Sequence, residues 1–104
     1  MIRFIQERGQ SLAKMVTIRF PSILSKMIGE KKVVFEAKTM GEALDKLAEI
    51  YGERLKEKMF EESGSLNRFL IFCLNGMMIP TAEILTTPLK ENDEVAILVV
   101  IGGG

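Results

Sequence analysis

The sequence predicts a domain of the α+β class, with one mixed sheet of about five strands, one main helix and one short helix. Three observations predict this class. Residues 16–20 alternate apolar and polar side chains, which is the period of a half-buried strand. Residues 40–51 place apolar side chains at helical spacing along one stripe. Two further runs, 69–74 and 95–101, are apolar at nearly every position, as in strands inside a sheet.

The length of the chain limits it to one domain, because 104 residues suit a single hydrophobic core. Residues 1–14 are predicted to be an N-terminal extension and residues 15–104 the folded domain, since the apolar residues of the first segment sustain no period. We interpret the extension as a frayed or loosely docked tail. The alternative is an amphipathic arm that covers a partner or a membrane surface. Met15 is also a candidate start of translation.

Two strands are predicted before the main helix. The first, 16–20, ends at Pro21, which cannot donate to a sheet ladder. The second, 32–36, follows a loop that contains Gly29 and is close enough in sequence to pair with the first as a hairpin.

A capping box predicts where the main helix begins. In this motif the Thr39 hydroxyl accepts a hydrogen bond from the backbone N–H of Glu42, and the Glu42 carboxylate reaches back. Gly52 is placed to end the helix. A short second helix is expected over 53–61, before a Ser-Gly-Ser break.

The second half of the chain predicts three strands. An Asn-Gly turn at 75–76 joins the runs 69–74 and 77–80, which is a strong hairpin signal because both turn residues need positive φ. The last strand, 94–101, follows a polar turn at 90–93. With one crossing helix between two hairpins, the first and last strands can lie side by side in the middle of the sheet.

The composition excludes several classes of function. The chain has 14 Lys and Arg against 14 Asp and Glu, no His and one Cys. A net charge of zero argues against binding nucleic acid by bulk electrostatics. The missing His and the single Cys exclude an intramolecular disulfide, a thiolate zinc site and a four-Cys iron-sulfur cluster. We expect no bound metal, and the residues do not favour self-contained catalysis.

Neither a signal peptide nor a membrane span is predicted. Arg3, Glu7 and Arg8 interrupt the apolar residues near the start, where a secretory signal needs an unbroken apolar run. The longest apolar run near the end, 95–101, is far shorter than the ~20 residues of a membrane-spanning helix. We expect a cytoplasmic protein with no membrane partner, and the single Cys suits a reducing compartment.

The two apolar strands suggest a surface for a partner. If the helices cover one face of the sheet, alternate residues of these strands form an exposed apolar patch on the other face. Alternatively, the short helix or the extension covers that face, or both strands are simply buried on both sides. The candidate interface residues are Phe69, Ile71, Cys73, Ile97, Val99 and Ile101.

Other chemistry-bearing residues are interpreted as structural. Cys73 has no neighbouring His or activating charge in the sequence, so we expect a small core residue rather than a reactive thiol. Met40 and Met59 lie on helical stripes and are expected in the core. The carboxylates of 53–62 are mixed with Lys and Arg, which is typical of a solvated helix face rather than an acid/base pair.

The chain ends in three glycines, directly after an apolar strand. A glycine tail can enter a channel too narrow for any Cβ and can take backbone conformations closed to other residues. It therefore suits a carboxylate that another enzyme must reach. The alternative is an inert flexible end.

These features together resemble the MoaD/ThiS sulfur-carrier family. The resemblance covers 15–104 and rests on the terminal glycines, the turn and strand start at 90–95, the hairpin at 74–76 and the helix capped by Thr39. It implies a ubiquitin-like β-grasp fold. Asn92 stands where many members have Gly, and we expect it to take the left-handed conformation.

The resemblance also implies a mechanism in which the chain is a cosubstrate. A MoeB-like enzyme uses ATP to adenylate the Gly104 carboxylate, and a sulfur donor converts the adenylate to a thiocarboxylate. The tail, given access by Gly102 and Gly103, then enters a MoaE-like large subunit and donates sulfur in molybdenum or tungsten cofactor synthesis. The chain would be the non-catalytic small subunit of molybdopterin synthase, with no cofactor of its own.

Other functions stay open. The same tail chemistry serves carriers for thiamine thiazole or tRNA thiolation, although the insertion between Gly52 and Phe69 favours the molybdopterin type over the compact thiazole type. The activated Gly104 is also able to form isopeptide bonds with lysines, as in a protein modifier. A third hypothesis is an interaction module whose tail is inert.

Overall fold

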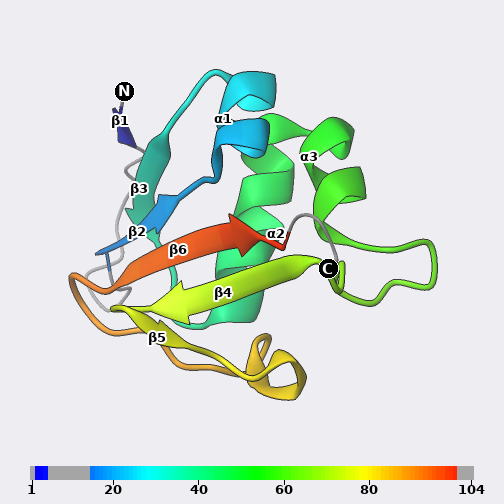
Figure 1. Ribbon diagram of the computed structural model, residues 1–104. Helices are drawn as coiled ribbons and strands as arrows, with labels where there is room; N and C mark the ends of the chain where they lie inside the picture. The colour runs from blue at the N-terminus through cyan, green and yellow to red at the C-terminus, as the bar shows by residue number, and fades with distance from the viewer. Residues whose placement is uncertain (1, 5–14, 101–104) are drawn as a thin grey trace.

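The computed structural model describes residues 2–4 and 15–100. The strands form a single sheet in the order β1-β3-β2-β6-β4-β5, and the helices pack on it (Figure 1). The strands are β1 (Ile2–Phe4), β2 (Met15–Arg19), β3 (Lys32–Glu36), β4 (Leu70–Leu74), β5 (Met77–Met78) and β6 (Glu94–Val99). The helices are α1 (Ser22–Ile28), α2 (Met40–Tyr51), α3 (Glu53–Met59) and the short 3-10 helix η1 (Thr81–Glu83).

The sheet has the predicted mixed topology. The first and last strands of the domain, β2 and β6, pair in parallel at its centre, with Ile18 opposite Val95. β3 is antiparallel to β2, and β4 is antiparallel to both β6 and β5. The predicted α+β class is therefore confirmed, with β1 added as a sixth strand at the β3 edge.

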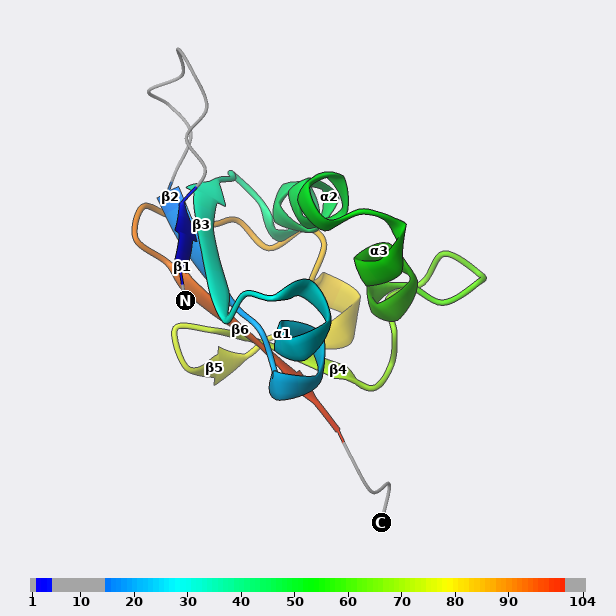
Figure 2. The ribbon, with the colours of Figure 1, turned by 90° about the horizontal axis from the view of Figure 1, so that it is seen from above.

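The helices α1, α2 and α3 lie on one side of the sheet, where they enclose the core (Figure 2). The fully buried side chains from both layers include Ile18, Val33, Phe35, Met40, Leu44, Leu47, Leu55, Met59, Phe72, Val95 and Ile97. Met40 and Met59 are each 0% exposed, so the prediction that they are core residues is confirmed. Alternate strand positions point to this layer because successive side chains of a strand point to opposite faces.

The start of α2 is held by side-chain and backbone acceptors. The Thr39 hydroxyl accepts from the Glu42 N–H at 3.2 Å, as in a capping box, and the Glu42 carboxylate accepts from the Lys38 N–H at 2.8 Å, one residue before the N-cap. The Gly41 N–H donates to the Leu85 carbonyl at 3.0 Å. A Cβ on Gly41 would lie 2.8 Å from that oxygen, so only glycine fits this approach.

The predicted turns are present. Asn75 and Gly76 have φ of 50° and 88°, which are the positive values that an Asn-Gly hairpin turn requires. Asn92 has φ of 70°, so the expectation that it takes the left-handed conformation is confirmed.

Three elements of the described chain were not predicted, and one of them is the short 3-10 helix η1 after Pro80. Residues 22–28 form α1 in the segment expected to be a loop, and Gly29 ends this helix in the left-handed conformation with φ of 82°. Ile2–Phe4 forms β1 in the segment expected to be a frayed or loosely docked tail, since it pairs in parallel with β3. The remainder of the extension lies outside the described residues.

Asp93 links the turn that precedes β6 to the β4–β5 turn beside it. Asp93 is 9% exposed, and its carboxylate accepts from the Lys90 N–H at 2.7 Å and from the Asn75 side-chain amide at 2.8 Å. The Asn75 side-chain oxygen in turn accepts from the Glu94 N–H at 2.9 Å. These bonds hold the start of β6 against the β4–β5 turn.

We predict that Asp93→Ala lowers the free energy of unfolding by about 1–3 kcal/mol, because it leaves partly buried donors on Lys90 and Asn75 without their acceptor. Urea unfolding measures the change. Glu57→Ala, which removes an exposed carboxylate on α3, is the matched control and should change stability by less than about 0.5 kcal/mol. Equal stability of the two variants would contradict the role assigned to Asp93.

Candidate functional site

The candidate site is the end of β6 together with the sheet surface around it. β6 has hydrogen-bonded neighbours on both sides, and just past its end the Val100 N–H donates to the Phe69 carbonyl at 2.8 Å. This end reaches the margin of the molecule beside α1 (Figure 2). The predicted tail residues Ile101, Gly102, Gly103 and Gly104 follow it in sequence and lie outside the described residues.

An apolar surface covers the side of β6, β4 and β5 that faces away from the helices. The antiparallel register places Ile71 opposite Leu98, and Cys73 between Ala96 and Met78. Large side chains here are open to solvent: Leu98 is 47% exposed, Phe69 51% and Met78 67%. We call this surface the outer patch, which consists of Phe69, Ile71, Cys73, Met78, Ala96, Leu98 and Val100.

Two of the predicted interface residues lie on the other face. Ile97 is 1% exposed because it stands opposite Phe72 and faces the helices. Val99 stands opposite the buried Leu70 and packs against the core. The predictions that place Ile97 and Val99 on the outer face are therefore wrong: the register places Leu98, which lies between them, on the side of Ile71.

Cys73 also differs from its prediction as a small core residue. It is partly exposed and belongs to the outer patch, because Phe72 takes the core-facing position of that part of β4. Its partners across the strands are the apolar residues Ala96 and Met78.

The alternatives that would cover the outer patch are not seen in the part of the chain that the structure describes. α3 lies with the other helices on the opposite side of the sheet (Figure 1). The described strand of the extension, β1, pairs at the sheet edge next to β3 rather than over β4 and β6.

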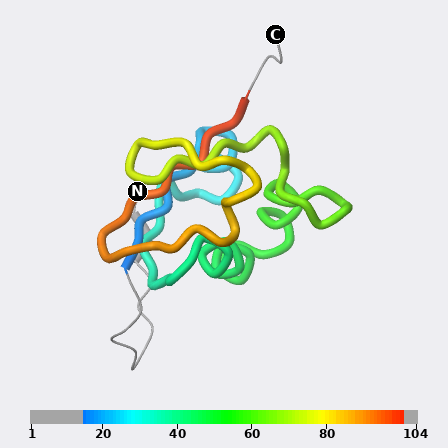
Figure 3. The backbone as a smooth tube through the Cα atoms, turned by 90° about the horizontal axis from the view of Figure 1, so that it is seen from below, coloured from blue at the N-terminus to red at the C-terminus, as the bar shows by residue number. Residues whose placement is uncertain are grey.

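A cavity of about 270 Å³ adjoins the outer patch at Phe69, near the end of β6 where the tail begins. It lies where α1, the start of β4 and the end of β6 meet, and these segments are side by side in Figure 3. Lys58 and Asn67 contribute the polar groups. The lining residues are Ile23, Leu24, Met27, Lys58, Asn67, Phe69, Leu70 and Val99.

Sequence reasoning missed the contribution of α1 to this cavity. Ile23, 62% exposed, and Met27 come from this helix. The spacing of Leu24, Met27 and Ile28 at i, i+3 and i+4, followed by Gly29, was the available signal.

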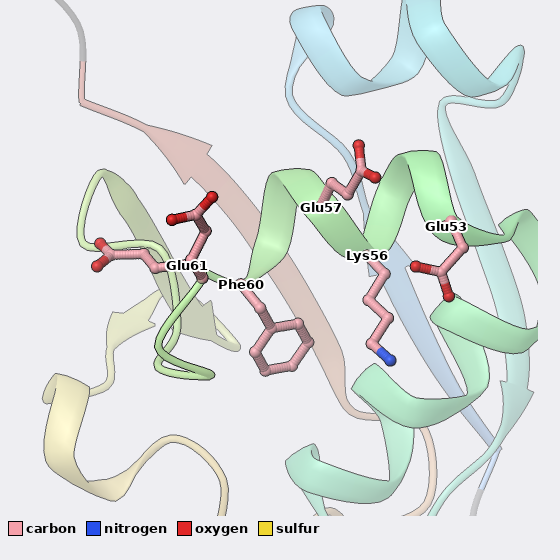
Figure 4. Close-up of a pocket in the computed structure, with 6 residues that line it drawn as sticks. Glu53, Lys56, Glu57, Phe60 and Glu61 are labelled. Atoms are coloured by element: carbon pink, nitrogen blue, oxygen red, sulfur yellow. The ribbon is translucent and has the colours of Figure 1, made fainter.

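The carboxylates of α3 do not form an acid/base site. Glu53, Lys56 and Glu57 are exposed along one helix, and Figure 4 shows their side chains spread along it rather than converging. The shallow depression that they line with Phe60, Glu61 and Glu62 has the mixed-charge, solvated character that the sequence predicted.

Two features of the described residues bear on other functions. Within residues 2–4 and 15–100, no cluster of three or more His, Cys, Asp or Glu side chains is arranged to hold a metal ion. Over the same residues, no helix has the length and apolar character needed to cross a membrane.

Comparison with known proteins identifies relatives over most of the chain. A model of the ThiS family matches residues 18–104. A relative from Archaeoglobus fulgidus, named as a candidate sulfur carrier protein, is 29% identical over 89 residues, which is 86% of this chain and 98% of the relative.

Solved structures share the ubiquitin-like β-grasp fold. Small archaeal modifier protein 1 from Methanosarcina acetivorans has a TM-score of 0.77 and 26% identity, over 88% of this chain and 98% of its own. A chain of the BexX/CysO complex from Amycolatopsis orientalis has a TM-score of 0.71 and 28% identity, over 86% of this chain and 99% of its own. A molybdopterin converting factor subunit 1 from Pyrococcus furiosus, also named as a candidate, has a TM-score of 0.64 and 15% identity, over 86% of this chain and 100% of its own.

Adjacent substitutions on β6 test the assignment of its two faces. We predict that Ile97→Ala lowers the free energy of unfolding by about 2–5 kcal/mol, because it opens a cavity in the core. Leu98→Ala removes a half-exposed side chain and should cost less than about 1 kcal/mol. Urea unfolding of both variants measures the difference, and an equal loss at the two positions would contradict the register.

Proposed function

Because the chain belongs to the ThiS family of ubiquitin-like sulfur carriers, we propose that its Gly104 carboxyl group is the group that is activated and loaded with sulfur. One observation carries this proposal: the family match continues through residue 104, so it includes the three terminal glycines as well as the fold. These glycines follow β6, the strand that has neighbours on both sides.

The chemistry needs an activating partner. A carboxylate is a poor acyl donor, because its leaving group is an oxide. In the proposed reaction a MoeB-like enzyme joins the Gly104 carboxylate to the α-phosphate of ATP and releases pyrophosphate. Hydrosulfide from the sulfur source then attacks the acyl carbon and displaces AMP, which leaves a thiocarboxylate. The difficult substitution is thereby divided into two activated steps.

The surface around the end of β6, where the tail begins, suits the binding of two enzymes in turn. The outer patch and the neighbouring cavity offer apolar area directly beside Val100, and apolar surface of this kind marks protein interfaces. We propose that the activating enzyme and the sulfur-accepting enzyme use this area in turn. Glycines beyond it would enter a narrow active-site channel, because they lack a Cβ.

The acceptor that we propose is the molybdopterin precursor, which makes the chain the small subunit of molybdopterin synthase, with a MoaE-like large subunit as its partner. One observation supports this choice over a thiazole carrier: the presence of α3 and its following loop between Gly52 and Phe69. The fold shared with the Pyrococcus furiosus protein is compatible with it. Carriers for thiamine thiazole or tRNA thiolation would use the same tail chemistry.

A protein modifier is the second candidate. The neighbour from Methanosarcina acetivorans is named a small archaeal modifier protein and is 26% identical, compared with 15% for the molybdopterin converting factor subunit. In this alternative a lysine amine, rather than sulfur, attacks the activated Gly104.

We predict that incubation with ATP, a MoeB-like enzyme and a sulfur source converts the chain to a product whose mass reflects one oxygen replaced by sulfur. Intact-mass spectrometry measures the product. A variant that lacks Gly104 should be as stable as the full chain. Its terminal carboxylate then belongs to Gly103, and it should give no thiocarboxylate. An unchanged mass of the full chain with partners that load another carrier would contradict the proposal.

The acceptor is tested by capture in cell extract. We predict that the tagged chain recovers a MoaE-like subunit, and that Leu98→Asp on the outer patch reduces the recovery about tenfold or more while leaving the fold intact. Recovery of a thiazole synthase or a tRNA-modifying enzyme would assign a different acceptor. Gly104 joined to lysines of other proteins would favour the modifier, and recovery that survives deletion of all three glycines would favour an inert tail.

A further inference from the structure

Three basic side chains flank the end of β6, where the tail begins. Lys26 of α1 lines a depression together with Leu98 and Val99. Lys58 of α3 lines the cavity described above, which shares Val99 with this depression. Figure 2 shows α1 beside this end of β6. The third basic residue, Arg68, precedes β4, and we call Lys26, Lys58 and Arg68 the basic surface.

Arg68 lies beside the last described residue of the chain. Its guanidinium carbon is 5.4 Å from the centre of the Phe69 ring, within the range of a cation–π contact. The Phe69 carbonyl in turn accepts a hydrogen bond from the Val100 N–H. Arg68 therefore adds a positive charge to the end of the outer patch at which the tail begins.

Within residues 2–4 and 15–100, no carboxylate forms an ion pair with the basic surface. The ion pair in this part of the chain joins Arg19 to Glu94. Neither the cavity nor the depression beside Val99 is lined by Asp or Glu. Glu61 accepts from the backbone N–H of Arg68 at 3.2 Å, rather than from its guanidinium group. The three cations are exposed and available to an outside partner.

Acidic side chains gather in a different place. The depressions along α2 and α3 have Lys56 as the basic residue among their lining, and their acidic residues are Asp45, Glu49, Glu53, Glu57, Glu61 and Glu62. The whole chain has 14 basic and 14 acidic residues, so it is neutral. The charges are nevertheless separated on the surface, and the area around the end of β6 is positive.

The short tail requires a partner to bind close to this positive area. Four residues, 101–104, follow Val100. Even a fully extended segment of four residues spans at most about 14 Å. An enzyme that reacts with the Gly104 carboxyl group must therefore lie against the residues around the end of β6, and these include the basic surface.

We propose that the basic surface binds carboxylates around the active-site entrance of the enzyme that activates Gly104. This inference rests on the proposed function. The activating enzyme is the partner because activation precedes transfer of sulfur to any acceptor, as well as conjugation to lysine. Complementary charges at the rim of an interface raise the association rate and fix the orientation of the partners. Here they would align the tail with the entrance, beside the apolar contact of the outer patch.

A charge reversal on α3 tests the proposal with a matched control. Lys58 and Lys56 are both exposed and both lie in the last turn of α3, so Lys58→Glu and Lys56→Glu change the net charge and the helix end alike. Lys58 lines the cavity with Val99, whereas Lys56 lines a depression with Glu53. Urea unfolding verifies that both variants remain folded.

We predict that Lys58→Glu raises the KM for the carrier about tenfold or more and leaves kcat unchanged, because the side chain acts in binding rather than in chemistry. Lys56→Glu should change KM by less than about twofold. Thiocarboxylate formation, measured with ATP, a sulfur source and the MoeB-like enzyme of the same organism, supplies both constants. Lys26→Glu and Arg68→Glu should act as Lys58→Glu does, and Lys90→Glu, before the start of β6, as Lys56→Glu does.

Ionic strength gives a readout that a purely structural role would not change. Raising it from about 0.1 M to about 0.5 M screens exposed charges, so the KM of the wild type should rise steeply. The KM of Lys58→Glu should rise less, because one attractive pair is already lost. The difference between the two variants should therefore shrink as salt is added.

The outcomes separate this inference from the proposed function. If the wild-type chain is not loaded at all, the proposed function fails and this inference fails with it. If the wild type is loaded but Lys58→Glu and Lys56→Glu have equal KM values, only the inference is overturned. A KM of the wild type that does not depend on salt, or a loss confined to kcat, would overturn it as well.

Discussion

The parallel pairing of β2 and β6 at the centre of the sheet is the constraint on which the rest of this structure depends. Ile18 and Val95, opposite each other, are 0% exposed. At the start of the pair the Thr17 N–H donates to the Asp93 carbonyl at 3.0 Å, and the Asn92 N–H donates to the Met15 carbonyl at 2.8 Å. β3 extends the sheet from β2, and β4 extends it from β6, so both hairpins depend on a contact between segments far apart in sequence.

The two sides of the sheet have different roles in this arrangement: one side forms the core and the other keeps apolar side chains exposed. One side of the sheet is buried under α1, α2 and α3, and its side chains supply the core. The other side keeps Phe69 and Leu98 about half exposed, in a patch that reaches the root of the tail. Because β6 has a strand on each side, the position from which the tail leaves is held by the same pairing that closes the fold. In the proposed reaction, the partner meets this fixed surface beside the point where the tail residues begin.

Family membership and fold do not select the final acceptor. Neighbours with this fold include a modifier protein, a CysO complex and a molybdopterin converting factor subunit, at 15–28% identity. One fold can host several functions, because function depends on the site and its partners rather than on the framework. We therefore expect residues outside the core, such as those of the outer patch and of α1, to distinguish the acceptors.

The sequence by itself determined the features whose causes are local. The alternation of 16–20, the capping box at Thr39 and the Asn-Gly turn each depend on a few neighbouring residues, and all are present as expected. The terminal glycines are likewise visible without any structure. Only the tertiary structure decided which face each apolar strand residue takes, because an unbroken apolar run carries no period and the register of β4 with β6 assigns Ile97 to the core and Leu98 to the surface. The same holds for β1, since strand pairing with β3 is a long-range backbone interaction that no local pattern records.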